Sequence, residues 1–140
     1  MDTDDIKRLE RVCLKSDLNL PGFGEKFQNV LAVPKMEYDN ESEAEWLEID
    51  VDGFNYNISR PYKVGTLQEW DDTTPEGCNF GIDISIHKDH PSVLDNTWVE
   101  DRVATVCKQL ATAFNTTVYH HRSFIFGINK SERKRVVFNP

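Results

Sequence analysis

The fold is decided by residues 47–58, which read LEIDVDGFNYNI. Apolar and polar side chains alternate on both sides of Asp52-Gly53, and this pattern predicts a β-hairpin with a two-residue turn, because both turn residues must accept positive φ. The turn also sets the register, so the strands pair outward from Val51 opposite Phe54. The apolar side chains then share one face, which must lie on the core side. The other face carries Glu48 opposite Asn57 and Asp50 opposite Asn55.

A third strand is predicted at residues 78–86, where large apolar residues alternate with small or polar ones. In a meander with the hairpin, this strand adds Asp83 and Ser85 to the polar face. The sequence therefore predicts one solvated sheet face that presents three acids, Glu48, Asp50 and Asp83.

The N-terminal part is predicted to be a helix followed by a short strand. Apolar residues recur at helical spacing within residues 3–18, at Ile6, Leu9, Val12 and Cys13. Residues 20–24, which read LPGFG, should break this helix, and the apolar run at residues 30–33 should form a strand. Residues 37–45 are expected to be an exposed loop, because they are too acidic to pack.

The C-terminal part is predicted to hold a second helix and two or three strands. Thr97 and Glu100 form a capping box, and Asn115 suits the C-terminal end of this helix. Its apolar stripe consists of Val99, Val103, Val106, Leu110 and Phe114. Strands are expected at residues 117–121 and 124–128, around Arg122-Ser123, with a last one at residues 135–138.

Together these elements predict an α+β fold: a mostly antiparallel sheet, with a central three-strand meander plus C-terminal strands, and two helices packed on it. A chain of 140 residues is long enough to bury a core, and we expect a single domain over residues 1–140.

The charge of the chain is concentrated in one window. Residues 37–52 hold eight acids and no base, and the formal net charge of the whole chain is -8. Such a block repels itself and attracts cations or a basic partner. The same charge disfavours nucleic acid as a partner, because phosphates would be repelled.

Several classes of protein are not expected from the composition. The longest apolar runs are far shorter than the roughly 20 residues that span a bilayer, so we expect no membrane partner. The start of the chain, MDTDD, has the wrong charge for a secretory signal, and we expect a cytoplasmic protein. Cys13, Cys78 and Cys107 are widely spaced, without a CxxC pair, and are expected to be buried free thiols. No cofactor is expected.

The four histidines are candidates for catalysis or metal binding. His87 and His90 have HxxH spacing, but the segment leads out of a strand and shows no third ligand, so a polar loop is the better interpretation. His120 and His121 are adjacent within a predicted strand, so one should face the core or a helix and the other solvent. An exposed histidine beside Arg122 could act as a general base. We nevertheless expect no catalytic and no metal residues.

The acidic window also invites comparison with calcium sites. Acids alternate at Asp39, Glu41, Glu43 and Glu45. The glycine and closing glutamate of an EF-hand loop are absent at the required positions, and a solvated loop is the simpler interpretation.

Binding of a protein partner is the better-supported prediction. Glu48, Asp50 and Asp83 are held on ordered strands, where like charges cost stability unless a partner neutralises them. Trp70 lies among acids, which is the composition of an interface hot spot, although it could equally fold back and close the core beneath its loop. The predicted partner-binding residues are Glu48, Asp50, Asp83, Asn55, Asn57, Trp70, Asp71 and Asp72.

The acidic hairpin 46–59, the acidic Trp70 loop and the strand 78–86 cover about a third of the chain. On these features the chain resembles, at the level of class, the immunity proteins of bacterial polymorphic toxin and contact-dependent growth inhibition systems. The resemblance implies a small cytoplasmic inhibitor, monomeric when free, that binds and neutralises a basic toxin domain such as a nuclease. Nuclease toxins are basic because they bind phosphates, and an acidic inhibitor gains steered association with them.

Two alternatives stay open. The expected order of helix, three strands, helix and strands also resembles that of type III secretion chaperones, which are acidic and of similar length. Those proteins normally close with a third helix, whereas residues 130–140 here read as turn and strand. The other alternative is a small hydrolase or nuclease that uses His120 or His121.

Overall fold

The computed structural model of the chain describes residues 7–87 and 89–140. These residues form a single seven-stranded sheet in which all neighbouring strands are antiparallel, in the order β2-β3-β4-β5-β1-β6-β7. The strands are β1 (Lys7–Leu14), β2 (Glu37–Asn40), β3 (Ala44–Val51), β4 (Phe54–Pro61), β5 (Phe80–Ile86), β6 (Val118–Phe126) and β7 (Lys130–Phe138).

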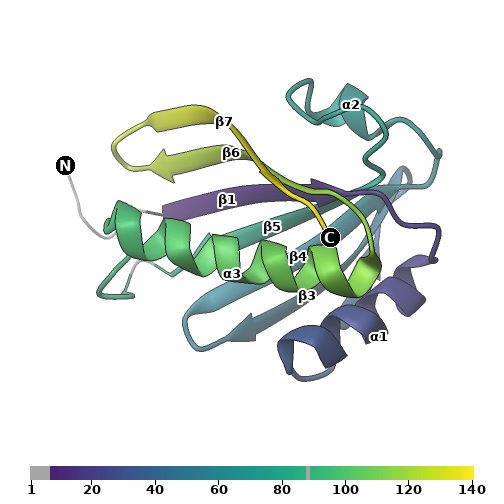
Figure 1. The fold of residues 1–140 in the computed structure, drawn as a ribbon, viewed down its shortest axis with the longest axis horizontal. Helices are drawn as coiled ribbons and strands as arrows, with labels where there is room; N and C mark the ends of the chain where they lie inside the picture. The colour runs from purple at the N-terminus through teal and green to yellow at the C-terminus, as the bar shows by residue number, and fades with distance from the viewer. Residues whose placement is uncertain (1–6, 88) are drawn as a thin grey trace.

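Three helices accompany the sheet: α1 (Leu20–Leu31), the short α2 (Leu67–Trp70) and α3 (Asn96–Phe114). Figure 1 shows α1 and α3 on the same face of the sheet, with α2 held in a long connection away from them. The core lies between the two long helices and the apolar face of the strands. The prediction of an α+β fold, with a mostly antiparallel sheet and two helices packed on it, is confirmed.

The hairpin at residues 47–58 is confirmed in its strands, turn and register. Val51 pairs with Phe54, and the pairing continues outward to Leu47 and Ile58. Asp52 and Gly53 both have positive φ, at 51° and 84°, as a two-residue turn requires. The third strand is confirmed as β5, which pairs with β4 so that Asp83 lies opposite Asn57.

The predicted helix over residues 3–18 is wrong wherever the structure describes it, because residues 7–14 form β1, an interior strand between β5 and β6. Its core face starts with Arg8 and Glu10, which are buried as an ion pair at 3.2 Å beneath α3, and continues with Val12 and Leu14. Because two inward positions hold charged residues, the sequence of β1 does not show the alternation of apolar and polar residues that identifies a strand. Residues 3–6 lie outside the described residues. The chaperone-like element order, which started from this helix, is not the order found.

The segment predicted to break a helix in fact begins one. Asn19 caps α1 by accepting a hydrogen bond from the Gly22 amide at 2.8 Å, and Pro21 lies in the first turn, where its missing N–H costs nothing. Gly24 packs so closely on β3 that a Cβ there would lie 2.2 Å from Leu47 Cδ1. The predicted strand at residues 30–33 is also wrong. Residues 30 and 31 belong to the last turn of α1, and Ala32 caps the helix in the left-handed conformation.

Residues 37–45 are not wholly a loop, because residues 37–40 form β2 at the edge of the sheet. Every residue of β2 is exposed, as predicted, but residues 44 and 45 begin β3, and Glu45 is buried beside Arg60, so the prediction is also wrong at this end. An edge strand needs only one hydrogen-bonded neighbour and no buried side chains, and an acidic sequence can therefore occupy it.

The C-terminal elements are close to their predictions. The apolar stripe of α3 faces the core and Asn115 caps the helix in the left-handed conformation, but Asp95, not Thr97, caps the N-terminus. The two strands predicted around Arg122-Ser123 are one strand, β6, with an irregular register near His120. The reversal comes later, at Gly127 and Asn129, which both have positive φ.

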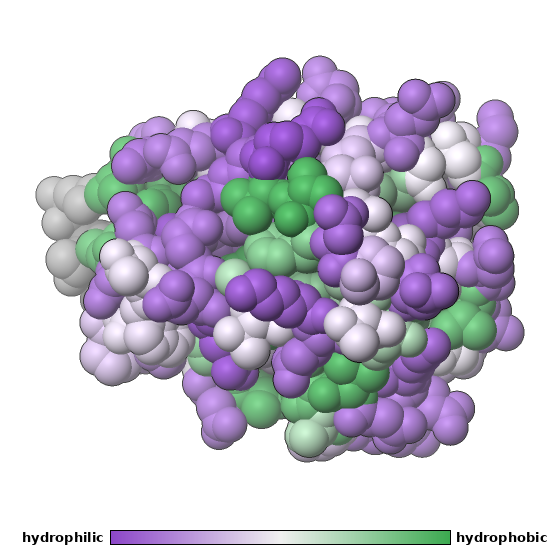
Figure 2. Space-filling view, viewed as in Figure 1, coloured by the Kyte–Doolittle hydropathy of each residue, from purple (hydrophilic) through white to green (hydrophobic). Residues whose placement is uncertain are grey.

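Figure 2 shows the face that carries α1 and α3, where hydrophilic residues surround small hydrophobic patches. Among the described residues, no helix is long and apolar enough to cross a membrane. The three cysteines are free and buried, as predicted.

Candidate functional site

The face of the sheet opposite α1 and α3 is the candidate functional surface, and we call it the open face. Side chains directly opposite each other on paired strands share a face. The register therefore places Glu48, Asp50, Asn55, Asn57 and Asp83 together on the open face, as predicted. Of the three helices in the described residues, only the short α2 does not lie on the other face (Figure 1).

One side of the open face is an acidic edge, which we define as Glu37 and Asp39 of β2 with Glu48 and Asp50 of β3. Glu37 lies directly opposite Glu48, a like-charge pair that disfavours the strand pairing. The Asn55 amide donates to both Glu48 Oε1, at 2.8 Å, and Asp50 Oδ1, at 2.9 Å. Among the described residues, no Lys, Arg or His forms an ion pair with any of these four carboxylates.

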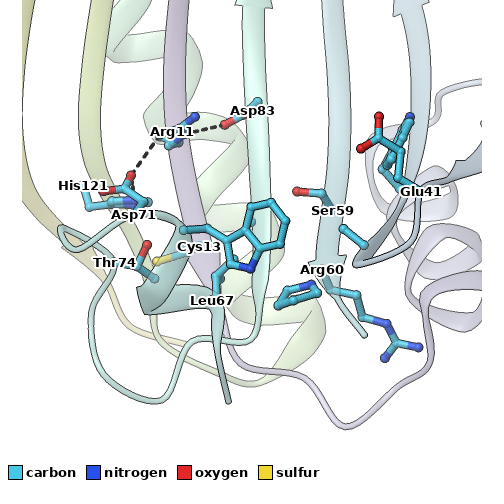
Figure 3. Close-up of a pocket in the computed structure, with 15 residues that line it drawn as sticks. Arg11, Cys13, Glu41, Ser59, Arg60, Leu67, Asp71, Thr74, Asp83 and His121 are labelled. Carbon is cyan, nitrogen blue, oxygen red and sulfur yellow. Dashed lines mark hydrogen bonds and ion pairs between the residues drawn. The ribbon is translucent and has the colours of Figure 1, made fainter. Parts of the chain in front are cut away.

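Asp83 belongs to a different environment, although it was predicted with Glu48 and Asp50. Arg11 of β1 donates from Nε to Asp83 Oδ1 at 3.0 Å, and from Nη1 to Asp71 Oδ2 at 3.0 Å. Figure 3 shows Arg11 between these two carboxylates. Arg122 Nη1 lies 3.5 Å from Asp71 Oδ1. We call Arg11, Asp71, Asp83, His121 and Arg122 the charged cluster.

Asp71 does not lie on an exposed rim, because it is the centre of the charged cluster and only 9% of its side chain is exposed. Burial acts to raise its pKa, but hydrogen bonds from the hydroxyl and amide of Thr73, together with Arg11, outweigh burial and hold the pKa at about 2. Burial raises the pKa of Asp83, and Arg11 opposes that shift. Asp72, in contrast, is exposed, with an ion pair to Arg133 at 3.8 Å.

The two adjacent histidines do lie on opposite faces, but the prediction that one faces solvent is wrong. His120 is buried on the helix face, with Nε2 3.7 Å from Glu10 and Nδ1 3.8 Å from Glu100 of α3. His121 is buried on the open face under the α2 connection, with Nε2 3.6 Å from Asp71 Oδ2. Burial lowers the pKa of His121 to about 4, so the imidazole is neutral at pH 7.

A cavity of about 290 Å³ adjoins the charged cluster on the open face. Trp46 of β3 and Trp70 of α2 contribute to its walls, and Ser59, Gly81 and Cys13 line it from three adjacent strands. Figure 3 shows Glu41, Ser59 and Arg60 on the side opposite His121 and Asp71. Trp70 is 57% exposed, so it does not close the core beneath its loop.

The remaining predicted sites have ordinary surroundings. His90 packs its ring on Phe54 and Trp98, with centroids 5.4 Å and 4.6 Å away, in agreement with a structural role. Among the described residues, no group of three or more His, Cys, Asp or Glu side chains is placed to hold a metal ion.

Sequence reasoning missed Arg11, Trp46 and His121 as parts of one site. The helix predicted over residues 3–18 does not place Arg11 beside Asp83, because only a strand at residues 7–14 pairs with β5. Trp46 precedes the alternating run of the hairpin, and its pairing with Ser59 follows from extending the predicted register by one residue. That extension was the available signal for a tryptophan on the open face.

No family model, curated protein or solved structure matches this chain. The functional argument therefore depends on the geometry of the open face.

Proposed function

We propose that this protein binds a basic protein domain through the open face and neutralises it, in the manner of an immunity protein against a toxin. A toxin that cleaves nucleic acid would present the basic surface that fits. The protein is then an inhibitor that acts by protein–protein interaction and carries out no reaction itself.

The observation that carries the proposal is the uncompensated charge of the acidic edge. Elsewhere on the sheet, buried or half-buried acids have cations beside them: Glu10 has Arg8, Glu45 has Arg60, and Asp83 has Arg11. The four carboxylates of the acidic edge have no such partner among the described residues, although they stand on ordered strands. A basic partner supplies the missing cations and is steered to the surface by its charge.

A direct test measures the affinity of this protein for a purified basic nuclease toxin domain. The variant Glu48→Lys/Asp50→Lys should weaken binding by at least about a hundredfold, since juxtaposed like charges cost several kcal/mol at an interface. The matched control, Glu25→Lys/Asp101→Lys, makes the same change of charge at exposed positions on α1 and α3, and should change the affinity by less than about threefold.

Association of the wild-type protein should also slow as salt rises, because screening shortens the reach of the acidic edge. Equal losses of affinity in the two double variants would show that only net charge matters and that the open face is not the interface. Unchanged affinity in Glu48→Lys/Asp50→Lys would overturn the proposal.

A further inference from the structure

We propose that the cavity between Trp46 and Trp70 is a binding site for a single cationic side chain, an arginine or lysine of the partner protein. This inference rests on the proposed function and names the point at which the partner is anchored. The cavity volume of about 290 Å³ suits one long side chain.

The charges that line the cavity leave a deficit of positive charge. Arg11 is already shared between Asp71 and Asp83, and Arg60 lies 3.7 Å from Glu45. Glu41 also lines the cavity and forms no ion pair with a described residue. The net effect of the lining is therefore to attract a cation, and the neighbouring acidic edge adds to that attraction.

Two further features match a guanidinium or ammonium group. The faces of tryptophan rings attract cations more strongly than those of other aromatic residues. His121 is only 2% exposed and lines the cavity, and neither of its ring nitrogens has a hydrogen-bond partner among the described residues. Nε2 of His121 lies 3.6 Å from the Asp71 carboxylate, which favours the proton on that nitrogen and leaves Nδ1 as an acceptor for the N–H of a cationic ligand.

The test uses short peptides in place of the partner: Ac-Gly-Arg-Gly-NH2, its citrulline analogue and its glutamate analogue. Citrulline has nearly the shape of arginine without the charge. The chain has three tryptophans, and Trp98 packs on Phe54 on the other face of the sheet, so its indole signal is an internal reference in two-dimensional NMR. The arginine peptide should shift the indole N–H signals of Trp46 and Trp70 and leave that of Trp98 in place.

The citrulline peptide should bind at least about tenfold more weakly, and Trp70→Ala should reduce the binding of the arginine peptide by about tenfold. Equal binding of the citrulline and arginine peptides, preference for the glutamate peptide, or shifts limited to Trp98 would overturn this inference. These outcomes are independent of the toxin domain. If the arginine peptide did not bind but the toxin domain did, only the cation site in the cavity would be rejected. If the peptide bound but the toxin domain did not, the proposed inhibitor function would be rejected.

A separate observation concerns Cys13 and Cys78, from which we infer a redox-active thiol pair. Their sulfur atoms lie 3.2 Å apart, although 65 residues separate them in the chain. Both thiols are buried and free, and a disulfide requires an approach to about 2.05 Å. Cys13 is buried but also lines the cavity, so a small oxidant in the cavity lies beside the thiol pair.

Hydrogen peroxide is a suitable oxidant for this pair. Both S–H bonds and the O–O bond break, one S–S bond forms, and two water molecules leave. The thiol of Cys13 hydrogen-bonds to the sulfur of Cys78, which lowers the pKa of Cys78 and favours its reactive thiolate. The disulfide would join β1 to the end of the connection that carries Trp70.

Mass spectrometry of the native full-length protein tests this pair. One equivalent of peroxide, followed by unfolding and maleimide labelling, should leave only Cys107 labelled, with Cys13 and Cys78 joined in one cross-linked peptide. Cys107→Ser should form the same cross-link, whereas Cys13→Ser and Cys78→Ser should retain their two remaining thiols. Three labelled cysteines after oxidation, or a cross-link to Cys107, would overturn the inference.

Discussion

The acidic edge and the charged cluster lie on the same face of one sheet, and both consist largely of carboxylates on neighbouring strands. In the charged cluster, Asp71 and Asp83 share Arg11 at 3.0 Å each. In the acidic edge, Glu37 lies opposite Glu48, and no described cation is paired with either. Acids of one sheet face therefore divide into those that are paired within the structure and those that remain unpaired at its surface.

The difference comes from the neighbouring elements. The charged cluster lies over the interior strands β5, β1 and β6 and beneath the α2 connection, so its charges are partly removed from water and must be compensated. The acidic edge lies at the rim of the sheet, where water screens the charges and like-charge pairs cost little. An acid at the rim can therefore stay unpaired, whereas an acid in the middle cannot.

Removal of Arg11 should have the largest effect on this comparison. Arg11→Met leaves two half-buried carboxylates without their shared cation, and should lower the free energy of unfolding by about 3 kcal/mol, at the low end for a broken buried pair because Arg11 is partly exposed. Urea unfolding at pH 7 measures the change. The double variant Arg11→Met/Asp83→Asn should recover at least half of the lost free energy of unfolding. If Arg11→Met were as stable as the wild-type protein, the cluster would contribute nothing to stability.

The sheet could be predicted from the sequence where alternation was clean. Residues 47–58 and β5 met this condition, and their register followed from the Asp52-Gly53 turn alone. The interior strand β1 could not be recognised, because Arg8 and Glu10 occupy inward positions that are apolar in typical strand patterns. Burial of that ion pair depends on α3, which is distant in the chain.

The candidate site was predictable only in part, for the same reason. Glu48 and Asp50 were placed correctly by local pairing. The partners of Asp83 and Asp71 come from β1, whose strand character was hidden, so both acids were grouped with the unpaired ones. Counting charges cannot separate paired from unpaired acids without the sheet order.

The pH dependence of stability should come from His121 before it comes from the acids. Burial lowers the pKa of His121 from 6.5 to about 4, so between these values the unfolded chain binds a proton that the folded protein excludes. The contribution of His121 to the free energy of unfolding is therefore complete above pH 6.5, and about 2 kcal/mol of stability is lost as the pH falls to 4. This loss is smaller than the free energy that corresponds to the whole pKa shift, because water enters the site as the ring becomes protonated.

His121→Gln should abolish most of this loss in urea unfolding between pH 7 and pH 4. The matched control is His87→Gln, since the side chain of His87 is 59% exposed, and it should retain the wild-type profile. Asp71, whose pKa lies at about 2, adds a further loss only below its ordinary value of 3.8. A wild-type profile that is flat from pH 7 to pH 4 would contradict the burial of a neutral His121.

The Asp52-Gly53 turn fixes which acids face outward, and Gly53→Ala should test that dependence. Gly53 has φ of 84°, and an added Cβ would lie 3.2 Å from His90 Cδ2. We expect a loss of about 1 kcal/mol in the free energy of unfolding, from left-handed strain in a residue with a side chain. Asp52→Asn is the control and should be neutral, because asparagine tolerates positive φ. An unchanged Gly53→Ala protein would mean that strand pairing, not the turn, sets the register.

The smallest effect is expected at the acidic edge itself, and it distinguishes the two regions most directly. Glu48→Gln/Asp50→Asn removes two charges but keeps oxygen acceptors for the Asn55 amide. Stability should rise by up to about 0.5 kcal/mol at low salt, because like-charge repulsion is relieved. The gain should vanish near 1 M salt, where the Debye length is about 3 Å.

Asp71→Asn makes the same chemical change inside the charged cluster, and there it should lower stability at every salt concentration, since Arg11 loses the carboxylate whose ionised form the cluster favours. Parallel urea titrations at low and high salt compare the two variants. If Glu48→Gln/Asp50→Asn were also destabilising at low salt, the acidic edge would be a structural element like the cluster, and its carboxylates would not be available to a basic partner. A gain at the edge together with a loss in the cluster is the result that a surface kept ready for binding requires.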